Sequence, residues 1–446
     1  MQPKRQKETP DLFRSRRDQM LDCKHPLFKL ANRIDWSFFE KEFSGIYHET
    51  MGRPGKSIRL MVALHYLKYT FDLSDEALLE GFLENPYWQY FCGFEYFQHR
   101  LPTDPSNMTR FRDRVGDQGF EKMLHALLCT AQDMKVLSAY DLHKVNVDTT
   151  VQEKAIAFPT DSRLYYKMRK KLVNLSFERN IKLRQSYVRK GKEALMRQSR
   201  YAHAKQYRRA ARETRQLKTF LGRVYRDISR KAVEFDPELR HYLYLANCLL
   251  KQEKQSKDKL YSIHAPEVEC ISKGKAHKRY EFSVKAGIAT TSKGNWVVGI
   301  QSFPGNPYDG HTLEKTLEQV ERLTGKQARE VYVDKGYRGH GYTGDAQVHI
   351  VGTRKMKNMT RTFRKWLKRR NAIEPIFGHL KSDNRMSRNY LKGSEGDQIN
   401  ALLSGCGFNM RKLLAVFLLP YFVYIKFSQI LKNYQSKWFK FHYSFV

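Results

Sequence analysis

The sequence is poor in cysteine and lacks any cysteine and histidine pattern of a zinc site. The six cysteines among 446 residues are scattered, with no CxxC pair and no histidine at zinc-binding spacing. This pattern excludes a zinc finger and a small disulfide scaffold, and it predicts buried thiols in a reducing compartment. The chain also lacks a GxxxxGKS or GxxxxGKT phosphate loop, so the sequence gives no sign of a reaction driven by ATP or GTP hydrolysis at such a loop.

Long apolar runs are scarce as well. The N-terminal segment 1–8 is charged, with no apolar stretch behind it, so a secretory signal is not expected. The most apolar run covers residues 413–425, contains Pro420, and falls short of the ~20 residues that span a bilayer. We expect this run to form a core element and the protein to have no membrane partner.

Acidic residues are few relative to basic ones. Lys and Arg total 81 against 46 Asp and Glu, which gives a formal net charge of +35. Such an excess is too large for a neutral metabolic enzyme and is typical of a polyanion-binding protein, most often one that binds DNA or RNA. Charge alone would also fit a ribosomal protein or a protein of the membrane surface.

The first domain predicted from the sequence covers residues 1–135 and is helical. Ser57 precedes apolar residues at helical spacing from Leu60, and a turn at 72–76 leads into a second helix. A third segment begins near Pro105. The pattern fits a DNA-binding helix-turn-helix or an ordinary three-helix bundle, and a shared exposed face of Arg110, Arg112 and Arg114 would favour DNA.

Glycine and proline are nearly absent from residues 161–254, which argues for long helices and against a linker. We predict a basic helical insertion over residues 161–260. Its basic residues form either a solvated helical face or, as we favour, a surface that binds along the phosphate backbone of a nucleic acid. The residues chosen for DNA contact are Arg208, Arg209, Arg212 and Arg215.

Strand patterns flank this insertion, at 136–160 and again within 261–410. Residues 145–151 alternate around Asp148, a hairpin follows at 280–300, a helix opens at Asp309, and residues 331–333 lead into Asp334. A further strand at 348–351 and a helix over 363–381 complete the pattern. Strand, hairpin, helix, strand, strand and helix is the order of an α/β, RNase H-like fold with a mixed sheet and covering helices. Residues 411–446 are expected to form an apolar and basic tail.

Three carboxylates are expected to meet at one end of this sheet. Asp334 closes its strand, Asp148 is expected near the end of its own, and Glu374 lies on the last helix, bordered by apolar residues. Arg370 and Lys381 share its side of the helix, at spacings of four and seven residues. An exposed ion-pair face and an aspartate bonded to its own turn are the structural alternatives.

Carboxylates this close repel one another unless cations neutralise them. Oxygen ligands favour Mg²⁺, and two ions about 3.5–4 Å apart promote in-line phosphoryl transfer. The predicted cofactor is therefore a pair of Mg²⁺ ions held by Asp148, Asp334 and Glu374, for which Mn²⁺ can substitute.

Taken together, these motifs resemble the DDE transposases of bacterial insertion sequences, in the insertion-sequence-five branch. The resemblance covers residues 50 to 410 and rests on segments 147–152, 274–282, 309–313, 332–339 and 370–374 with Lys381. It implies that Asp148, Asp334 and Glu374 are catalytic, and that Arg370 and Lys381 contact transposon-end DNA. Leu367 replaces a tyrosine of the family pattern, which puts one DNA contact in doubt.

The resemblance further implies a bacterial cytoplasmic, nucleoid-associated protein. Its N-terminal helices would recognise terminal inverted repeats, and it would act on repeat and target DNA as a homodimer or larger synaptic assembly. The function expected is Mg²⁺-dependent cleavage at the transposon ends, followed by transfer of the 3′-hydroxyl ends to target DNA. Two alternatives remain: a DNA-binding regulator with a degenerate site, and a nuclease on the same fold that does not join strands.

Overall fold

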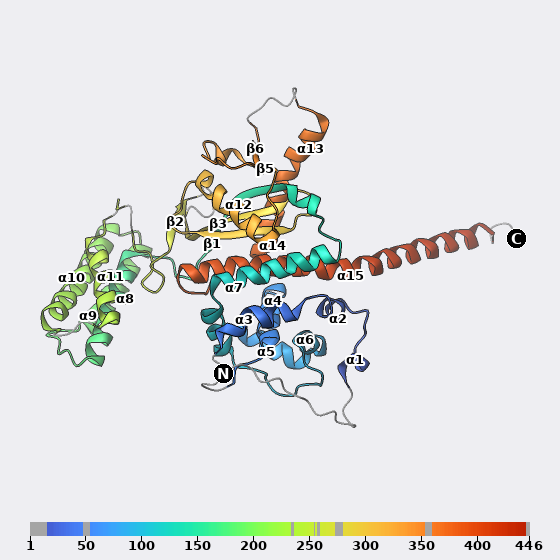
Figure 1. Ribbon diagram of the computed structural model, residues 1–446. Helices are drawn as coiled ribbons and strands as arrows, with labels where there is room; N and C mark the ends of the chain where they lie inside the picture. The colour runs from blue at the N-terminus through green and yellow to red at the C-terminus, as the bar shows by residue number, and fades with distance from the viewer. Residues whose placement is uncertain are drawn as a thin grey trace.

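The computed structural model describes residues 16–47, 54–232, 236–253, 255–256, 259–272, 280–352 and 359–442, with side chains to residue 418. The motif expected at 274–279, the N-terminal segment 1–8 and Gly52-Arg53 lie outside these residues, as do the side chains of 419–425. The described part combines a mixed sheet, helices on both sides of it and a separate helical lobe (Figure 1).

The sheet has six strands with the order β2-β3-β1-β5-β6, and β4 pairs with β3. β1 pairs antiparallel with β3 and parallel with β5, which in turn pairs parallel with β6. This mixed sheet is consistent with the predicted RNase H-like domain, although β2 was not predicted. The strands are β1 (Lys144–Glu153), β2 (Glu269–Ser272), β3 (Tyr280–Thr291), β4 (Val297–Phe303), β5 (Glu330–Val333) and β6 (Gln347–Ile350).

The N-terminal helices pack around α4, which is buried along almost its whole length. Its predicted start after Ser57 and the cap of α5 at Ser74 are confirmed, since Ser74 accepts a hydrogen bond from the Ala77 amide. The described helices are α1 (Arg17–Met20), α2 (Pro26–Ala31), α3 (Trp36–Phe43), α4 (Ile58–Thr70), α5 (Asp75–Glu84), α6 (Pro86–Phe91) and α7 (Pro105–Asp133), with a 3₁₀ turn η1 (Ser44–Ile46).

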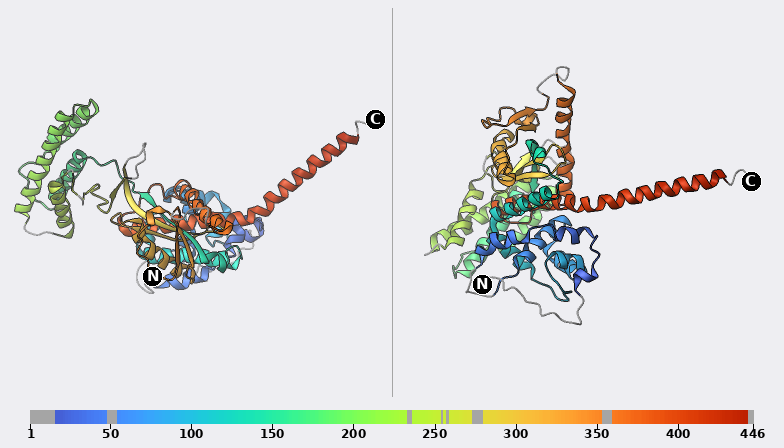
Figure 2. Two further views of the ribbon diagram at one scale, coloured as in Figure 1. Left: turned by 90° about the horizontal axis from the view of Figure 1, so that it is seen from above. Right: turned by 45° about the vertical axis from the view of Figure 1, so that its right-hand side comes forward.

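The long helix α15 (Gly393–His442) joins these helices to the sheet by packing against α4, α7 and β4. Gly407 lies against α4, where a Cβ atom would stand 2.3 Å from the Tyr69 carbonyl oxygen. Of the predicted core run, Leu413 is fully buried but Ala415 and Leu418 are exposed, so the expectation of a core element holds only at its start. The far end of the helix extends away from the protein (Figure 2). The part from Gly393 to Leu418 has the length and composition of a membrane span, but more than half of it is buried, as in a soluble core helix.

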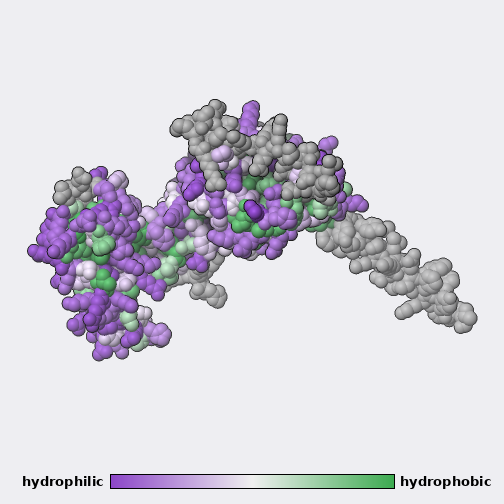
Figure 3. Space-filling model, turned by 90° about the horizontal axis from the view of Figure 1, so that it is seen from below, coloured by the Kyte–Doolittle hydropathy of each residue, from purple (hydrophilic) through white to green (hydrophobic). Residues whose placement is uncertain are grey.

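The predicted insertion is helical and has its own hydrophobic core. Residues from Leu164 to Leu260 form one buried cluster, while a second cluster contains the N-terminal helices, the sheet and α15. The insertion projects from the sheet as a separate lobe, with a largely hydrophilic surface (Figures 1 and 3). Its helices are α8 (Asp161–Glu178), α9 (Val188–His203), α10 (Tyr207–Lys231) and α11 (Pro237–Lys251).

The last predicted helix is broken into two. α13 (Arg361–Arg369) ends in a 3₁₀ turn, η6 (Arg370–Ala372), before α14 (Ile373–Ser382) begins. The prediction of one continuous helix was wrong because Pro375 has no amide hydrogen to donate to Asn371, and its ring blocks a straight helical continuation. The remaining elements are η2 (Ala139–His143), η3 (Asp309–Thr312), α12 (Leu313–Thr324) and η4 (Lys335–Tyr337).

Candidate active site

Asp148 and Asp334 meet because their strands are parallel neighbours. The register pairs Lys144 with Glu330 and Asn146 with Tyr332, so its extension by two residues places Asp148 opposite Asp334. Side chains alternate along strands, so residues opposite each other in register point to the same face. Asp334 follows the last residue of β5, where its Oδ1 accepts a hydrogen bond of 2.8 Å from the Gly336 amide. The predicted convergence of these two residues is therefore present in the fold.

Arg370 lies between the three predicted carboxylates. Its guanidinium hydrogen-bonds Asp148 Oδ2, and its nitrogens are 3.8 Å from Asp334 Oδ2 and 3.6 Å from Glu374 Oε1. The Arg370 side chain is only 11% exposed, whereas that of Glu374 is 60% exposed. The buried Ile373, Ile376 and Phe377 place Glu374 at the edge of the core, as expected.

One guanidinium does not balance the negative charge at this site. Burial raises the pKa of Asp148, and the nearby carboxylates of Asp334 and Glu374 raise it further; Arg370 and the Thr149 amide act in the opposite direction. The net effect brings the pKa of Asp148 to about 7. The sequence predicted a metal ion as the counter-charge of Asp148, and in this structure the guanidinium takes that position.

The donor set suits a hard divalent cation, because carboxylate oxygens are the ligands that Mg²⁺ prefers. Three carboxylates contact or approach the same guanidinium. Among the described residues, no three His, Cys, Asp or Glu side chains stand close enough to hold one ion together. The residue types therefore suit a divalent ion, but in this structure Arg370 lies between the carboxylates where such an ion would bind.

Sequence reasoning missed a fourth carboxylate at this end of the sheet. Asp309 was read only as the start of a helix, yet its Oδ1 accepts hydrogen bonds from Thr149 Oγ1 at 2.8 Å and Lys285 Nζ at 2.9 Å. Thr149 directly follows Asp148. The sequence signal for Asp309 was its place in the motif 309–313. Its partners, Thr149 and Lys285, lie on strands that are distant from it in sequence.

The predicted DNA contacts do not gather at the carboxylates. Arg208, Arg209, Arg212 and Arg215 are exposed on α10, in the separate lobe. Lys381 is half-buried near the end of α14, about 10 Å along the helix axis from Glu374. The structure therefore brings Arg370, but not the other five cations, to the three carboxylates.

The shared basic face proposed for α7 is absent. Arg110 and Arg114 are exposed, but Arg112 is buried and bonds Asp75 at 2.9 Å. Arg112 is therefore a structural ion-pair residue within the N-terminal helices. The expectation that these three arginines line one exposed surface was wrong, because residues two apart on a helix point in different directions.

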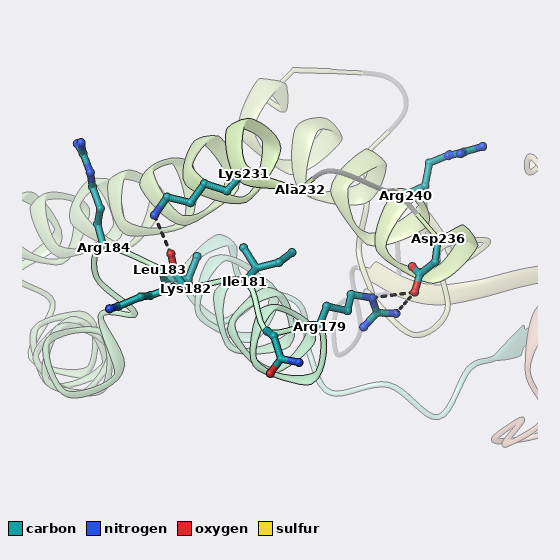
Figure 4. A pocket seen from close by; sticks show the side chains of 10 residues that line it. Arg179, Ile181, Lys182, Leu183, Arg184, Lys231, Ala232, Asp236 and Arg240 are labelled. Atoms are coloured by element: carbon teal, nitrogen blue, oxygen red, sulfur yellow. Dashed lines mark hydrogen bonds and ion pairs between the residues drawn. The ribbon is translucent and has the colours of Figure 1, made fainter.

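The insertion contains a basic cleft of about 1190 Å³, away from the carboxylates. Figure 4 shows Arg179 turned toward Asp236 and Lys231 turned toward the carbonyl of Lys182. The cleft thus contains its own internal charge partners. Its cationic lining residues are Arg179, Lys182, Arg184, Lys231 and Arg240.

A mixed sheet with carboxylates at one edge is compatible with an enzyme that acts on polynucleotides, and comparisons with known proteins support this class. Residues 15–114 match the family model described as Transposase domain (DUF772), and residues 251–410 match the Transposase DDE domain. The chain belongs to the DDE transposases of insertion sequences.

One relative is an uncharacterized protein, ORF8 in the nfe locus of Rhizobium meliloti. It is 51% identical over 197 residues, which cover 44% of this chain and 95% of that protein. No solved structure matches the chain.

Proposed function

We propose that the protein cleaves DNA at transposon terminal inverted repeats and transfers the resulting 3′-hydroxyl ends to target DNA. The observation that carries this proposal is the convergence of Asp148, Asp334 and Glu374 on one guanidinium at the end of the sheet. In hydrolysis a water oxygen attacks a phosphodiester, and in strand transfer a 3′-hydroxyl oxygen does. One set of carboxylates therefore serves both reactions.

Asp148, Asp334 and Glu374 would hold the divalent ions, Mg²⁺ or Mn²⁺. When bound, such ions stabilise the attacking and leaving oxygens of an in-line displacement at phosphorus. The chain orients its carboxylates for this purpose: Asp148 Oδ1 accepts the Thr149 amide at 2.7 Å, and Asp334 Oδ1 accepts the Gly336 amide at 2.8 Å. The second oxygen of each is the one that lies near Arg370.

DNA binding is assigned to cations at two places. Arg370 on η6 lies between the carboxylates and Lys381 lies further along α14, while Arg208, Arg209, Arg212 and Arg215 form an exposed group on α10. The N-terminal helices would recognise the terminal repeats. The net charge of +35 supports a polyanion partner for the whole chain. The protein would act as a homodimer or larger synaptic assembly in the cytoplasm, next to the nucleoid.

The test is cleavage of DNA carrying the terminal repeats by three full-length variants, Asp148→Asn, Asp334→Asn and Glu374→Gln. We expect each to lose Mg²⁺-dependent cleavage and to bind the same DNA in EDTA within about twofold of wild type, measured by fluorescence anisotropy. Each change removes a carboxylate charge and keeps the side-chain shape. Asp345→Asn, at an exposed loop carboxylate, is the matched control. A variant that cleaves at the wild-type rate would remove its residue from the site.

A further inference from the structure

Asp309 joins two strands beside the catalytic carboxylates. Its Oδ1 accepts hydrogen bonds from Thr149 Oγ1 in β1 and from Lys285 Nζ in β3. Lys285 is held in turn by the Pro307 carbonyl oxygen at 2.6 Å and is 13% exposed. Thr149 is the neighbour of Asp148, so one oxygen of Asp309 is anchored to the strand segment that carries a catalytic aspartate.

The other oxygen of Asp309 faces the turn that carries Asp334. A Cβ atom placed on Gly336 would lie 2.9 Å from Asp334 Oδ1 and 3.1 Å from Asp309 Oδ2. Both carboxylates therefore approach the same backbone position, which is open because residue 336 has no side chain. Asp309 thus contacts the surroundings of Asp148 through one oxygen and those of Asp334 through the other.

Tyr337 is the last residue of η4, the 3₁₀ turn that follows Asp334. Its side chain is fully buried. Burial, above all, and then the charges of Asp148, Asp309 and Asp334 raise its pKa. The pKa of this buried phenol thus responds to Asp309 as well as to Asp148 and Asp334.

We propose that Asp309 is a positioning residue for the catalytic carboxylates. Through Thr149 and the turn at Gly336, it fixes the separation of Asp148 and Asp334 at which both hold the divalent ions. This inference rests on the proposed metal-dependent function. A purely structural role, as the acid at the start of η3 and α12, would require only the favourable helix-terminal charge. It would not require the bonds to two strands.

The test measures Mn²⁺ binding to the full-length protein without DNA, by electron paramagnetic resonance of the free ion. Asp309→Asn keeps the side-chain shape but removes the charge that holds Lys285 and the acceptor strength toward Thr149. We expect Mn²⁺ affinity to fall about 10–100-fold, the usual loss when an outer-shell partner of a metal ligand is removed. Gly336→Ala, which leaves the Asp309 ion pair in place, is expected to weaken Mn²⁺ binding as well.

A matched control lies at the start of β1, where an ion pair joins β1 to β5. Glu330 pairs with Lys144 at 2.7 Å and is 29% exposed, against 30% for Asp309. Glu330→Gln should lower the unfolding temperature about as much as Asp309→Asn but leave Mn²⁺ affinity unchanged. Equal Mn²⁺ affinity for Asp309→Asn and Glu330→Gln would overturn the positioning role.

Asp148→Asn separates this inference from the proposed function. If Asp148→Asn loses Mn²⁺ binding while Asp309→Asn and Gly336→Ala keep it, only the positioning role fails. If Asp148→Asn binds Mn²⁺ as tightly as wild type, the proposed metal site itself fails. Reduced binding in all three variants, with Glu330→Gln unaffected, is the result that the proposal requires.

Discussion

Two buried aspartates show how the ratio of charges sets the behaviour of a carboxyl group. Asp148 shares one guanidinium with two other carboxylates, and its pKa is raised to about 7. Asp75 has the opposite surroundings, because Lys68 and Arg112 lie 2.7 and 2.9 Å from its two oxygens. Burial alone would raise the pKa of Asp75, but the two cations outweigh burial and hold it well below its usual value. Burial raises the pKa of both carboxyl groups, and only at Asp75 do the neighbouring cations outweigh it.

We expect Asp75→Asn to destabilise the N-terminal helices strongly. The change leaves Lys68 and Arg112, with side chains 7% and 6% exposed, without their counter-charge. Removing one partner of a buried ion pair costs about 3–5 kcal/mol, while an exposed pair contributes about 0–1 kcal/mol. Unfolding in urea measures the difference. The control is Glu42→Gln, which breaks the more exposed Lys122 pair. Equal stability losses for the two variants would contradict the account.

The depressed pKa of Asp75 makes the stability of the protein depend on pH. The pKa of Asp75 is depressed in the folded state, so its contribution is fully present above the unfolded-state pKa of about 3.9. It is lost as the pH falls through the much lower folded-state pKa. Wild type should therefore lose stability relative to Asp75→Asn as the pH falls below about 4. A stability difference that stays constant from pH 7 down to strongly acidic pH would refute this assignment.

Helix α10 presents its arginines as a stripe on one face. Exposed arginines recur at spacings of three, four or eight residues, which align along a helix. Arg208, Arg209, Arg212 and Arg215 form no ion pair within the described part of the chain. Opposite charges on the same face are therefore too few to neutralise it. The stripe consists of Arg208, Arg212, Arg215, Arg223, Arg226 and Arg230.

We expect replacement of Arg208, Arg209, Arg212 and Arg215 by Gln to weaken DNA binding and reduce its salt dependence. Each phosphate contact contributes about −0.9 to the slope of log K against log salt, so the slope should become less negative by up to about 3.6. Anisotropy titrations over a range of salt concentrations measure it. The control removes four exposed cations, Lys315, Arg322, Lys326 and Arg329, from α12 and the turn after it, where acidic residues are interspersed. Identical slopes for wild type and the α10 variant would make that stripe a solvated face.

Elements with strong local patterns were predicted well from the sequence. Alternating β-branched residues identified β1, β5 and the hairpin of β3 and β4, and these strands positioned Asp148 and Asp334. What failed depended on distant contacts. The burial of Arg112 and of α15 depends on packing against other helices, and the role of Asp309 depends on two strands remote in sequence. The break before α14 was readable from Pro375 but was overlooked.

At the scale of the whole molecule, the protein contains two separate hydrophobic cores. The insertion buries Leu221 in one, and the N-terminal helices, sheet and α15 bury Leu402 in the other. The four helices of the insertion bury apolar residues mainly against one another. The insertion therefore gains most of its stability from its own packing. Its exposed arginines lie on α10, which is part of that packed unit.

We expect core mutations to affect the two cores separately in calorimetry. Leu221→Ala and Leu402→Ala each remove a fully buried side chain, a change that costs about 2–5 kcal/mol. Leu221→Ala should lower the unfolding transition of the insertion and leave the larger transition in place, and Leu402→Ala should do the reverse. A single transition shifted equally by both variants would show that the cores unfold as one.

The measurement that tests the central claim most directly is a joining assay. Purified protein is incubated with DNA carrying its flanking terminal repeats and with a plasmid target, in Mg²⁺ and in EDTA, and products are separated on a gel. The account predicts cleaved ends and joined products in Mg²⁺ only, and neither product with Asp148→Asn. Cleavage without joining would contradict strand transfer and favour a nuclease, and DNA binding with neither product would contradict catalysis altogether.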